Sequence, residues 1–227
     1  MAAAPGLAQT AAEPLDECLD EAQPAPQRMS ACTRAIDTAK NDATRAQAHL
    51  QRGVLHEMGG ASETAAADYT ASIKLDPDNA LAYFNRGNAY DQLGQFDLAI
   101  ADYSQAVKLD PKEPDYFNNR GQAYDHKGAY DLAIADYTEA LRLEPDNARP
   151  LYNRGLAQAN KGDYRRAIAD FDEAIKLAPN DADLYLARGA AHEELGEQRA
   201  AKADFSKALE LDPENEDARE GLSRLGG

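Results

Sequence analysis

Two cysteines are the residues of this chain with the widest choice of chemistry. Cys18 and Cys32 stand 14 positions apart near the N-terminus. They lack the Cys-x-x-Cys spacing of a thioredoxin-like centre, and the further local ligands of a structural zinc site are missing. Two buried thiols or one disulfide remain as alternatives. A disulfide would stabilise the fold by about 3 kcal/mol in the chain-entropy model and implies an oxidising compartment.

The cysteine spacing suits a short helical hairpin. We expect helices over residues 15–22 and 28–39, with Pro24 and Pro26 at the turn between them. The first ten residues have neither the basic nor the apolar region of a complete signal peptide. A mature exported protein with an added Met would begin in this way, and so would a plain disordered tail.

An arginine and an aspartate form a second recurring pair. The arginine returns every 34 residues, and the aspartate follows it after 16. This co-occurrence favours a structural arginine–carboxylate bridge between helices over ligand contact, although duplication of one ancestor would also produce it. If the bridge is partly buried, loss of one partner would strand the other charge. The pairs are Arg52/Asp68, Arg86/Asp102, Arg120/Asp136, Arg154/Asp170 and Arg188/Asp204.

The remaining polar residues show no arrangement for catalysis. No glycine-rich phosphate loop, metal-ligand cluster or nucleophile–base pair is visible in the sequence. Each Ser, His and Asp has an ordinary place in a repeated pattern. We therefore predict a non-enzymatic protein with no catalytic residue, no metal site and no cofactor.

Charge narrows the choice of partner. The chain carries 40 acidic and 24 basic residues, a formal net charge of -16. Nucleic acid and anionic membrane surfaces are disfavoured, because both need a surface rich in Lys and Arg. No run of about 18 apolar residues is available to span a bilayer. A basic polypeptide remains a suitable partner, and the charge could equally serve solubility alone.

The elements that position these residues are five copies of a 34-residue unit between Ala46 and Asn215. A fixed period of this length predicts stacked helix pairs in which each repeat contacts only its neighbours. In the copy at residues 80–113, Asn79 is a good N-cap and Gly94 ends the first helix. Gly87 and Ala99 are small where the two helices should cross, so Gly87→Leu should wedge them apart.

These positions resemble the tetratricopeptide repeat (TPR). In the copy at residues 80–113 the signature is read in Tyr83, Gly87, Tyr90, Gly94, Phe96, Ala99, Tyr103, Ala106 and Pro111. The resemblance implies an all-α, right-handed α-solenoid in which the first helix of each repeat lines the concave face. The cysteine-containing prelude is also similar to exported TPR proteins of Gram-negative bacteria with Asn-Arg-Gly units. That likeness favours the periplasm, with the cytoplasm as the alternative.

The same resemblance sets the expected organisation of the chain. A disordered tail, residues 1–13, precedes a degenerate N-terminal helical hairpin, residues 14–45, and a capping helix over residues 216–227 ends the chain. The copy that starts at Ala46 is the most divergent. The five repeats between hairpin and cap are 46–79, 80–113, 114–147, 148–181 and 182–215.

The resemblance to TPR proteins implies a peptide-binding groove formed by the second, fifth, sixth, ninth, twelfth and thirteenth residues of each repeat. Asparagine can donate and accept hydrogen bonds at once, so a row of asparagines could hold a peptide backbone, although asparagine is also the common residue there in idealised repeats. The acidic lining would steer a peptide that carries Lys or Arg. The candidate groove residues are Leu50, Phe84, Asn85, Asn88, Asp91, Asn118, Asn119, Gln122, Asp125, Arg149, Tyr152 and Asn153.

We therefore expect a protein-interaction module or scaffold that binds a polypeptide segment, with basic residues as an expected feature of that segment. The fifth residues of the repeats contain no Lys, which argues against binding of chaperone C-terminal tails. The alternative function is a self-assembling scaffold, a homo-oligomer within a larger complex. Membrane insertion is not expected.

Overall fold

The computed structural model describes residues 13–226, which hold thirteen helices and no strand. The chain divides into two compact bodies, residues 1–98 and residues 99–227, which we call the N-terminal body and the C-terminal body. The expected disordered tail lies outside the described residues except for the exposed Glu13. Within the described part, no helix is both long and apolar enough to cross a membrane.

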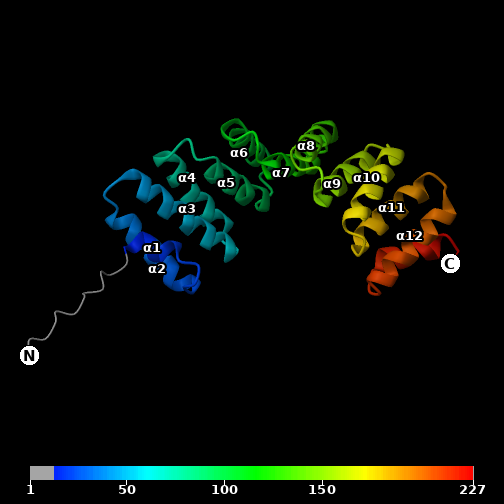
Figure 1. The fold of residues 1–227 in the computed structure, drawn as a ribbon, viewed down its shortest axis with the longest axis horizontal. Helices are drawn as coiled ribbons and strands as arrows, with labels where there is room; N and C mark the ends of the chain where they lie inside the picture. Colours follow the sequence, from blue (N-terminus) through cyan, green and yellow to red (C-terminus); the bar gives the residue numbers. More distant parts are fainter. Residues whose placement is uncertain (1–12, 227) are drawn as a thin grey trace, which may run out of the picture. The chain divides into compact units, whose positions relative to one another are not determined.

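Helices of the N-terminal body form a hairpin, one complete repeat and the first helix of the next (Figure 1). The hairpin consists of two helices, and α3 and α4 then pack against each other. The helices of this body are α1 (Pro14–Leu19), α2 (Ala25–Thr38), α3 (Asp42–Met58), α4 (Ser62–Leu75) and α5 (Ala80–Gln92).

Helices of the C-terminal body continue the alternation of first and second helices (Figure 1). The boundary between the bodies falls inside α6, most of which belongs to this body. Within the body, α7 packs on α8, α9 on α10 and α11 on α12. The helices are α6 (Phe96–Leu109), α7 (Pro114–His126), α8 (Tyr130–Leu143), α9 (Ala148–Asn160), α10 (Tyr164–Leu177), α11 (Ala182–Glu194), α12 (Gln198–Leu211) and α13 (Glu216–Arg224).

Each helix pair of the C-terminal body is held by an aromatic ring against a glycine. Tyr137 of α8 is buried, and a Cβ atom added to Gly121 of α7 would lie 2.7 Å from its Cε1 atom. The same contact brings Phe171 to within 2.5 Å of a Cβ built at Gly155. Glycine in a helix costs about 1 kcal/mol relative to alanine. The ring contact explains why the repeat keeps glycine at this register.

Arginine–aspartate bridges connect the two helices of a repeat, as predicted. Arg120 donates from Nε and Nη2 to the two carboxylate oxygens of Asp136, both at 2.7 Å. Its Nη1 atom donates to Ser104 Oγ at 3.2 Å, which also joins the preceding repeat. Arg86 and Asp102 belong to different bodies, so that pair stays a prediction. The described bridges are Arg52/Asp68, Arg120/Asp136, Arg154/Asp170 and Arg188/Asp204.

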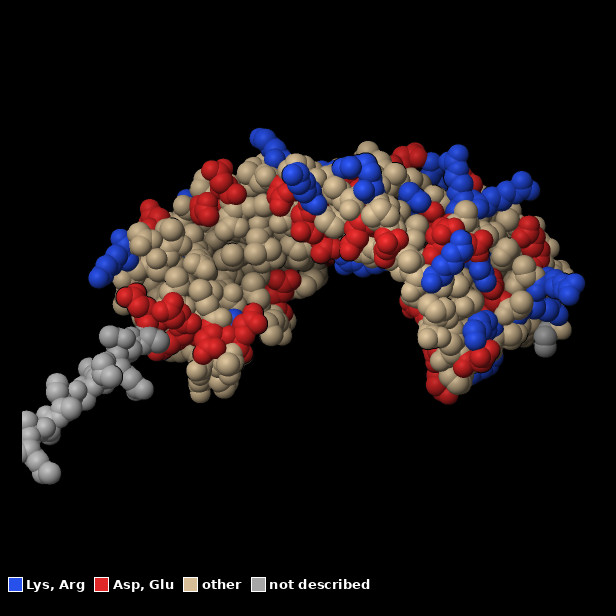
Figure 2. Space-filling model, in the orientation of Figure 1, with Lys and Arg blue, Asp and Glu red and all other residues tan. Residues whose placement is uncertain are grey.

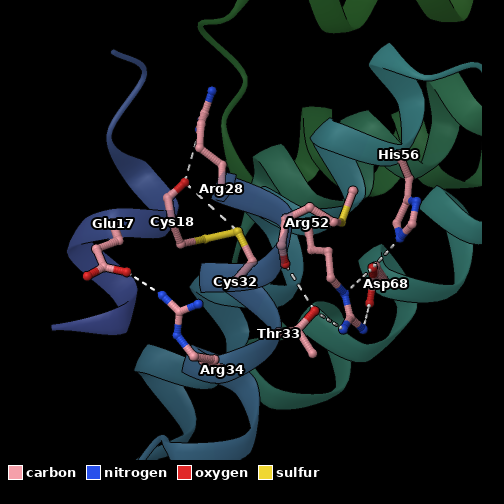
Figure 3. The surroundings of a disulfide bond; sticks show 10 residues. Glu17, Cys18, Arg28, Cys32, Thr33, Arg34, Arg52, His56 and Asp68 are labelled. Carbon is pink, nitrogen blue, oxygen red and sulfur yellow. Dashed lines mark hydrogen bonds and ion pairs between the residues drawn. A yellow bond between two sulfur atoms is a disulfide. The ribbon is translucent and has the colours of Figure 1, made fainter. Parts of the chain in front are cut away.

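The N-terminal hairpin is held by a buried disulfide between Cys18 of α1 and Cys32 of α2 (Figure 3). Arg28 is also buried, and its Nε atom donates to the carbonyl oxygen of Cys18 at 3.1 Å. The turn lies three residues earlier than expected, because α1 ends at Leu19 and α2 already begins at Ala25 with Pro26 in its first turn. Proline fits there since the first turn of a helix does not use its N–H groups.

The hairpin ends in a degenerate version of the second helix of a repeat. Thr33 of α2 accepts a hydrogen bond from Arg52 Nη1 at 3.2 Å (Figure 3), as Thr70 of α4 accepts one from Arg86 Nη1 at 3.0 Å. Thr33 precedes Thr70 by 37 residues, so the hairpin deviates from the 34-residue period. At the same offset, Cys32 stands where α4 has Tyr69.

Helix α13 caps the last repeat with a small apolar face. Gly221 lies against the ring of Phe205, and a Cβ at Gly221 would be 2.6 Å from its Cε2 atom. Leu222 and Leu225 pack beside them. The other face of α13 is exposed and polar, with charged side chains at Glu216, Asp217, Arg219 and Glu220.

Candidate peptide-binding face

The predicted groove residues lie on the first helices of the repeats, and in each body we call the surface of these helices its first-helix face. In the N-terminal body it is formed by α3 and α5, and in the C-terminal body by α7, α9 and α11. Neighbouring first helices touch within each body, since α3 contacts α5, α7 contacts α9 and α9 contacts α11. The face is thus continuous within each body.

In the N-terminal body this face includes exposed apolar side chains. Leu50 and Val54 are half-buried, whereas Met58 is 73% exposed and Leu81 is 47% exposed. Figure 2 shows an area with few charged side chains around α3 and α5. Met58 and Leu81 were not among the predicted site residues, although they occupy the thirteenth and second registers that define the groove.

The other predicted groove residues of the N-terminal body, three of them polar, sit beside these apolar side chains. Phe84, Asn85, Asn88 and Asp91, all on α5, are half-buried. These side chains therefore keep part of their surface at the face, next to the exposed apolar residues. The body thus combines apolar contact area with a few hydrogen-bonding groups, as many ligand sites do.

The acidic residue next to Met58 is hydrogen-bonded within the N-terminal body. Glu57 accepts hydrogen bonds from Tyr69 Oη at 2.7 Å and from Gln92 Nε2 at 3.2 Å. Burial raises the pKa of Tyr69, and the bond to Glu57 raises it further. This carboxylate therefore already has donors within the chain.

In the C-terminal body two of the predicted asparagines bond to the chain itself. Asn118 is 1% exposed, and its Nδ2 atom donates to Asn119 Oδ1 at 3.1 Å. Asn153 is 9% exposed and donates from Nδ2 to Asn118 Oδ1, also at 3.1 Å. A peptide could reach Asn118 only if these bonds broke. Asn119 and Gln122 are half-buried and keep part of their surface at the face.

An ion pair crosses from α7 to α9 at the second register. Arg149 is paired with Asp115, and both side chains are 50% exposed. Arg149, the basic residue of the predicted groove, thus neutralises a carboxylate that was expected to attract a ligand. On α9, burial raises the pKa of Tyr152, and the negative charges of Asp183 and Asp181 raise it further. The surroundings of the Tyr152 hydroxyl are therefore negatively charged.

Asp125 differs from Glu57 of the N-terminal body, which has two donors within the chain. Its Oδ1 atom is buried and accepts no hydrogen bond from any described residue. Burial raises the pKa of Asp125, while the neighbouring His126 acts in the opposite direction. A buried acceptor without a donor is costly, so this carboxylate is suited to receive a donor from outside the chain.

A hollow of about 850 Å³ lies away from the first-helix face, between α1 and α2. Acidic side chains of α1 gather along this edge of the N-terminal body (Figure 2), and Glu17 is paired there with Arg34 (Figure 3). Asp20 accepts hydrogen bonds from the following turn at Ala22 and Gln23. The carboxylates of Glu17 and Asp20 are thus satisfied locally.

The sequence matches models of the tetratricopeptide repeat over residues 60–114, 84–148, 148–181 and 182–215. These matches cover more than half of the chain, which therefore belongs to the tetratricopeptide repeat family. The N-terminal part of the first predicted repeat falls outside them, in line with its divergence. No curated protein matches the sequence.

Solved structures of TPR proteins share this fold. YrrB, described as a TPR protein with an unusual peptide-binding site, has a TM-score of 0.72 and 22% identity, and the match covers 86% of this chain and 99% of YrrB. MamA from Desulfovibrio magneticus RS-1 has a TM-score of 0.71 and 19% identity, with 75% and 97% coverage. The thermophilic TPR protein TTC0263 from Thermus thermophilus has a TM-score of 0.60 and 22% identity, with 79% and 98% coverage.

At these identities the likeness shows the fold alone. It confirms the predicted all-α solenoid of tandem helix pairs, and no catalytic family is indicated. The chain thus belongs to the class of TPR proteins. Proteins of this class are in general non-enzymatic modules for protein interaction.

Proposed function

We propose that this chain is a non-enzymatic interaction module whose first-helix face holds a segment of another polypeptide. One contrast supports the proposal. Stacking buries the residues that return in every repeat, such as the glycine and aromatic registers, whereas the fifth register changes between the half-buried Leu50, Phe84 and Tyr152. Side chains that vary and stay at the surface are available for recognition.

The apolar part of the face would supply contact area to the bound segment. Exposed apolar side chains at Met58 and Leu81 stand on the groove registers of the N-terminal body. Burial of apolar surface contributes about 25 cal/mol per Å². YrrB, with its peptide-binding site, is a precedent on the same fold for a bound peptide.

The polar and acidic first-helix face of the C-terminal body would select basic residues in a segment bound there. The chain carries a net charge of -16, and Asp125 and Asp183 lie on first helices of the C-terminal body. Complementary charge steers association and suppresses wrong partners more than it adds affinity. We therefore expect binding that weakens as the salt concentration rises.

A capture experiment with surface variants tests the binding face. Met58→Asp combined with Leu81→Asp places charge on the apolar face without altering a buried residue. Leu132→Asp is the matched control, because Leu132 is 51% exposed on α8, a second helix. We expect a partner captured by the wild type and by the control to be lost by the double variant. Equal capture by all three proteins would place binding elsewhere.

Self-assembly through the ends of the stack is the alternative function, and it has less support. Helix α13 presents the charged side chains of Glu216, Asp217, Arg219 and Glu220 outward, which disfavours stacking of another copy on this end. Light scattering across a range of concentrations separates the two functions. A mass that rises with concentration would favour the scaffold.

We also propose that the chain works in an oxidising compartment such as the periplasm. The buried disulfide between Cys18 and Cys32 supports this, because such bonds persist where thiols are not kept reduced. Alkylation of the natively expressed protein without reductant tests it by mass. Two alkylated cysteines would contradict the proposal.

A further inference from the structure

An acidic residue occupies the twelfth register of four repeats, and two of these residues show what such a carboxylate binds. Glu57 accepts its hydrogen bonds from Tyr69 and Gln92, within the N-terminal body. Glu193 of α11 receives Arg224 of α13, whose Nε and Nη2 atoms donate to Oε1 at 3.0 Å and to Oε2 at 2.9 Å. Each of these two carboxylates has two donors from the chain.

Asp125 stands at the same register of the third repeat without such donors. The residues of α9 at the registers of Gln92 and Arg224 are Asn160 and Leu156. Leu156 has no side-chain donor, and Asn160 is exposed and makes no described bond to Asp125. The Oδ1 atom of Asp125 is buried and accepts no hydrogen bond from the described residues.

We propose that Asp125 receives an arginine side chain of the bound polypeptide, in the way that Glu193 receives Arg224 of α13. The proposal rests on the proposed function, because it names one feature of the segment that the first-helix face would hold. Gln122, one helical turn before Asp125, is half-buried beside it and can bond to the backbone of the same segment.

Arginine fits this carboxylate better than lysine does. Its planar guanidinium donates two parallel hydrogen bonds to one carboxylate, whereas the lysine ammonium acts as a point charge. The terminal torsion of an aspartate is soft, so rotation about Cβ–Cγ can present either oxygen. Burial raises the pKa of Asp125, which is the expected sign for a carboxylate that still lacks a cation.

Peptide selection on the full chain tests the proposal directly and does not require an identified partner. A phage library of random dodecapeptides is panned against the wild-type protein, and the selected peptides are synthesised. Their affinities are measured for the wild type, for Asp125→Asn and for Asp146→Asn. Asp146 is exposed in the turn before α9, so its substitution removes the same charge away from the face.

The expected result is an arginine shared by the selected peptides. Replacement of that arginine by citrulline should weaken binding about tenfold or more on the wild type, as expected for a charge-assisted bond. The same replacement should have little effect on Asp125→Asn, and Asp146→Asn should behave as the wild type. Equal melting temperatures of the three proteins exclude a folding defect.

The two levels of the proposal fail in different ways. Peptides that bind the first-helix face with no arginine dependence, or with additive effects of citrulline and Asp125→Asn, would overturn the assignment of Asp125 and leave the proposed function standing. Selected peptides whose amide shift changes lie outside α3, α5, α7, α9 and α11, or a library that yields no binder, would overturn both.

Discussion

The N-terminal hairpin and the repeats solve the same packing problem by different chemistry. In the repeats, the second helix places an aromatic ring against a glycine of the first helix, as Tyr137 does with Gly121. In the hairpin, Cys32 occupies the position that corresponds to the ring and is bonded to Cys18.

The difference follows from the length of the first helix. Helix α1 has 6 residues, whereas α7 has 13, so α1 offers little apolar surface for burial. A covalent bond can replace burial in a segment that is too short to build a core. The comparison teaches that the repeat pattern can degenerate at an end when another interaction closes the helix pair.

Substitution of a repeat glycine tests the packing side of this comparison with the largest expected effect. Gly121→Leu would drive its side chain into the ring of Tyr137, because even a Cβ lies 2.7 Å from that ring. We expect a loss of about 3 kcal/mol or more, at or above the usual cost of overpacking. Urea unfolding measures it, with Ala135→Leu on the exposed side of α8 as the size control. A transition unchanged from the wild type would contradict the contact.

Removal of the disulfide tests the covalent side, with a loss of similar size confined to the hairpin. Cys18→Ser combined with Cys32→Ser should destabilise α1 and α2 by about 3 kcal/mol, the value for a loop of this length. Amide hydrogen exchange should accelerate in α1 and α2 and stay unchanged in the C-terminal body. Reductant should reproduce the effect in the wild type and have none on the variant. Protection of the hairpin after removal of the bond would show that packing alone suffices.

Acid should weaken the bridge of the first repeat by a smaller amount. Burial of Asp68 acts to raise its pKa, but the hydrogen bonds from Arg52 and His49 outweigh burial and lower it overall. A lowered pKa means that the folded state favours the carboxylate. The stabilisation is therefore complete above the pKa of the unfolded chain, about 3.9, and is lost as the pH falls through the folded value.

The test compares the pH dependence of unfolding between the wild type and Asp68→Asn. Below pH 4 we expect the difference in stability between the two proteins to shrink, because the wild-type carboxylate becomes protonated. His49 and His56 face the same carboxylate, so both proteins must be measured at each pH. A difference in stability that stays constant down to pH 2 would mean that the charge of Asp68 does not contribute to the stability of the folded protein.

The ion pair of the C-terminal cap should have the smallest effect. Arg224 is 56% exposed in its pair with Glu193, and exposed ion pairs add little to stability. Arg224→Ala should therefore lower the melting temperature only slightly and leave α13 docked through Gly221 and Leu222. Loss of amide protection throughout α13 would show that the pair, and not the apolar contact, holds the cap.

The sequence correctly predicted the contacts of residues that recur in every repeat. Residues that return every 34 positions, such as Gly121, Tyr137 and the partners of the Arg120/Asp136 bridge, are buried or bonded as expected. Their environment is the same in each copy, so one copy explains the others. The early end of α1 at Leu19 was not predicted, since it coincides with a turn in which Asp20 accepts hydrogen bonds from Ala22 and Gln23.

The candidate face was harder to predict, because its residues differ between copies and their state depends on neighbours. The register of Asn118 marks it as a groove residue, yet hydrogen bonds to Asn119 and Asn153 occupy its side chain. In the same way, the Oδ1 atom of Asp125 accepts no hydrogen bond because α9 places no donor beside it. Neither feature can be predicted from the sequence of one repeat alone, because both depend on the neighbouring repeat.

Crosslinking of the full chain to its partner in native extract, read by mass spectrometry, tests the central claim most directly. The account predicts that crosslinked residues fall on α3, α5, α7, α9 and α11, and that Met58→Asp with Leu81→Asp removes them. Crosslinks concentrated on α4, α8 and α10, and unaffected by that double variant, would contradict it.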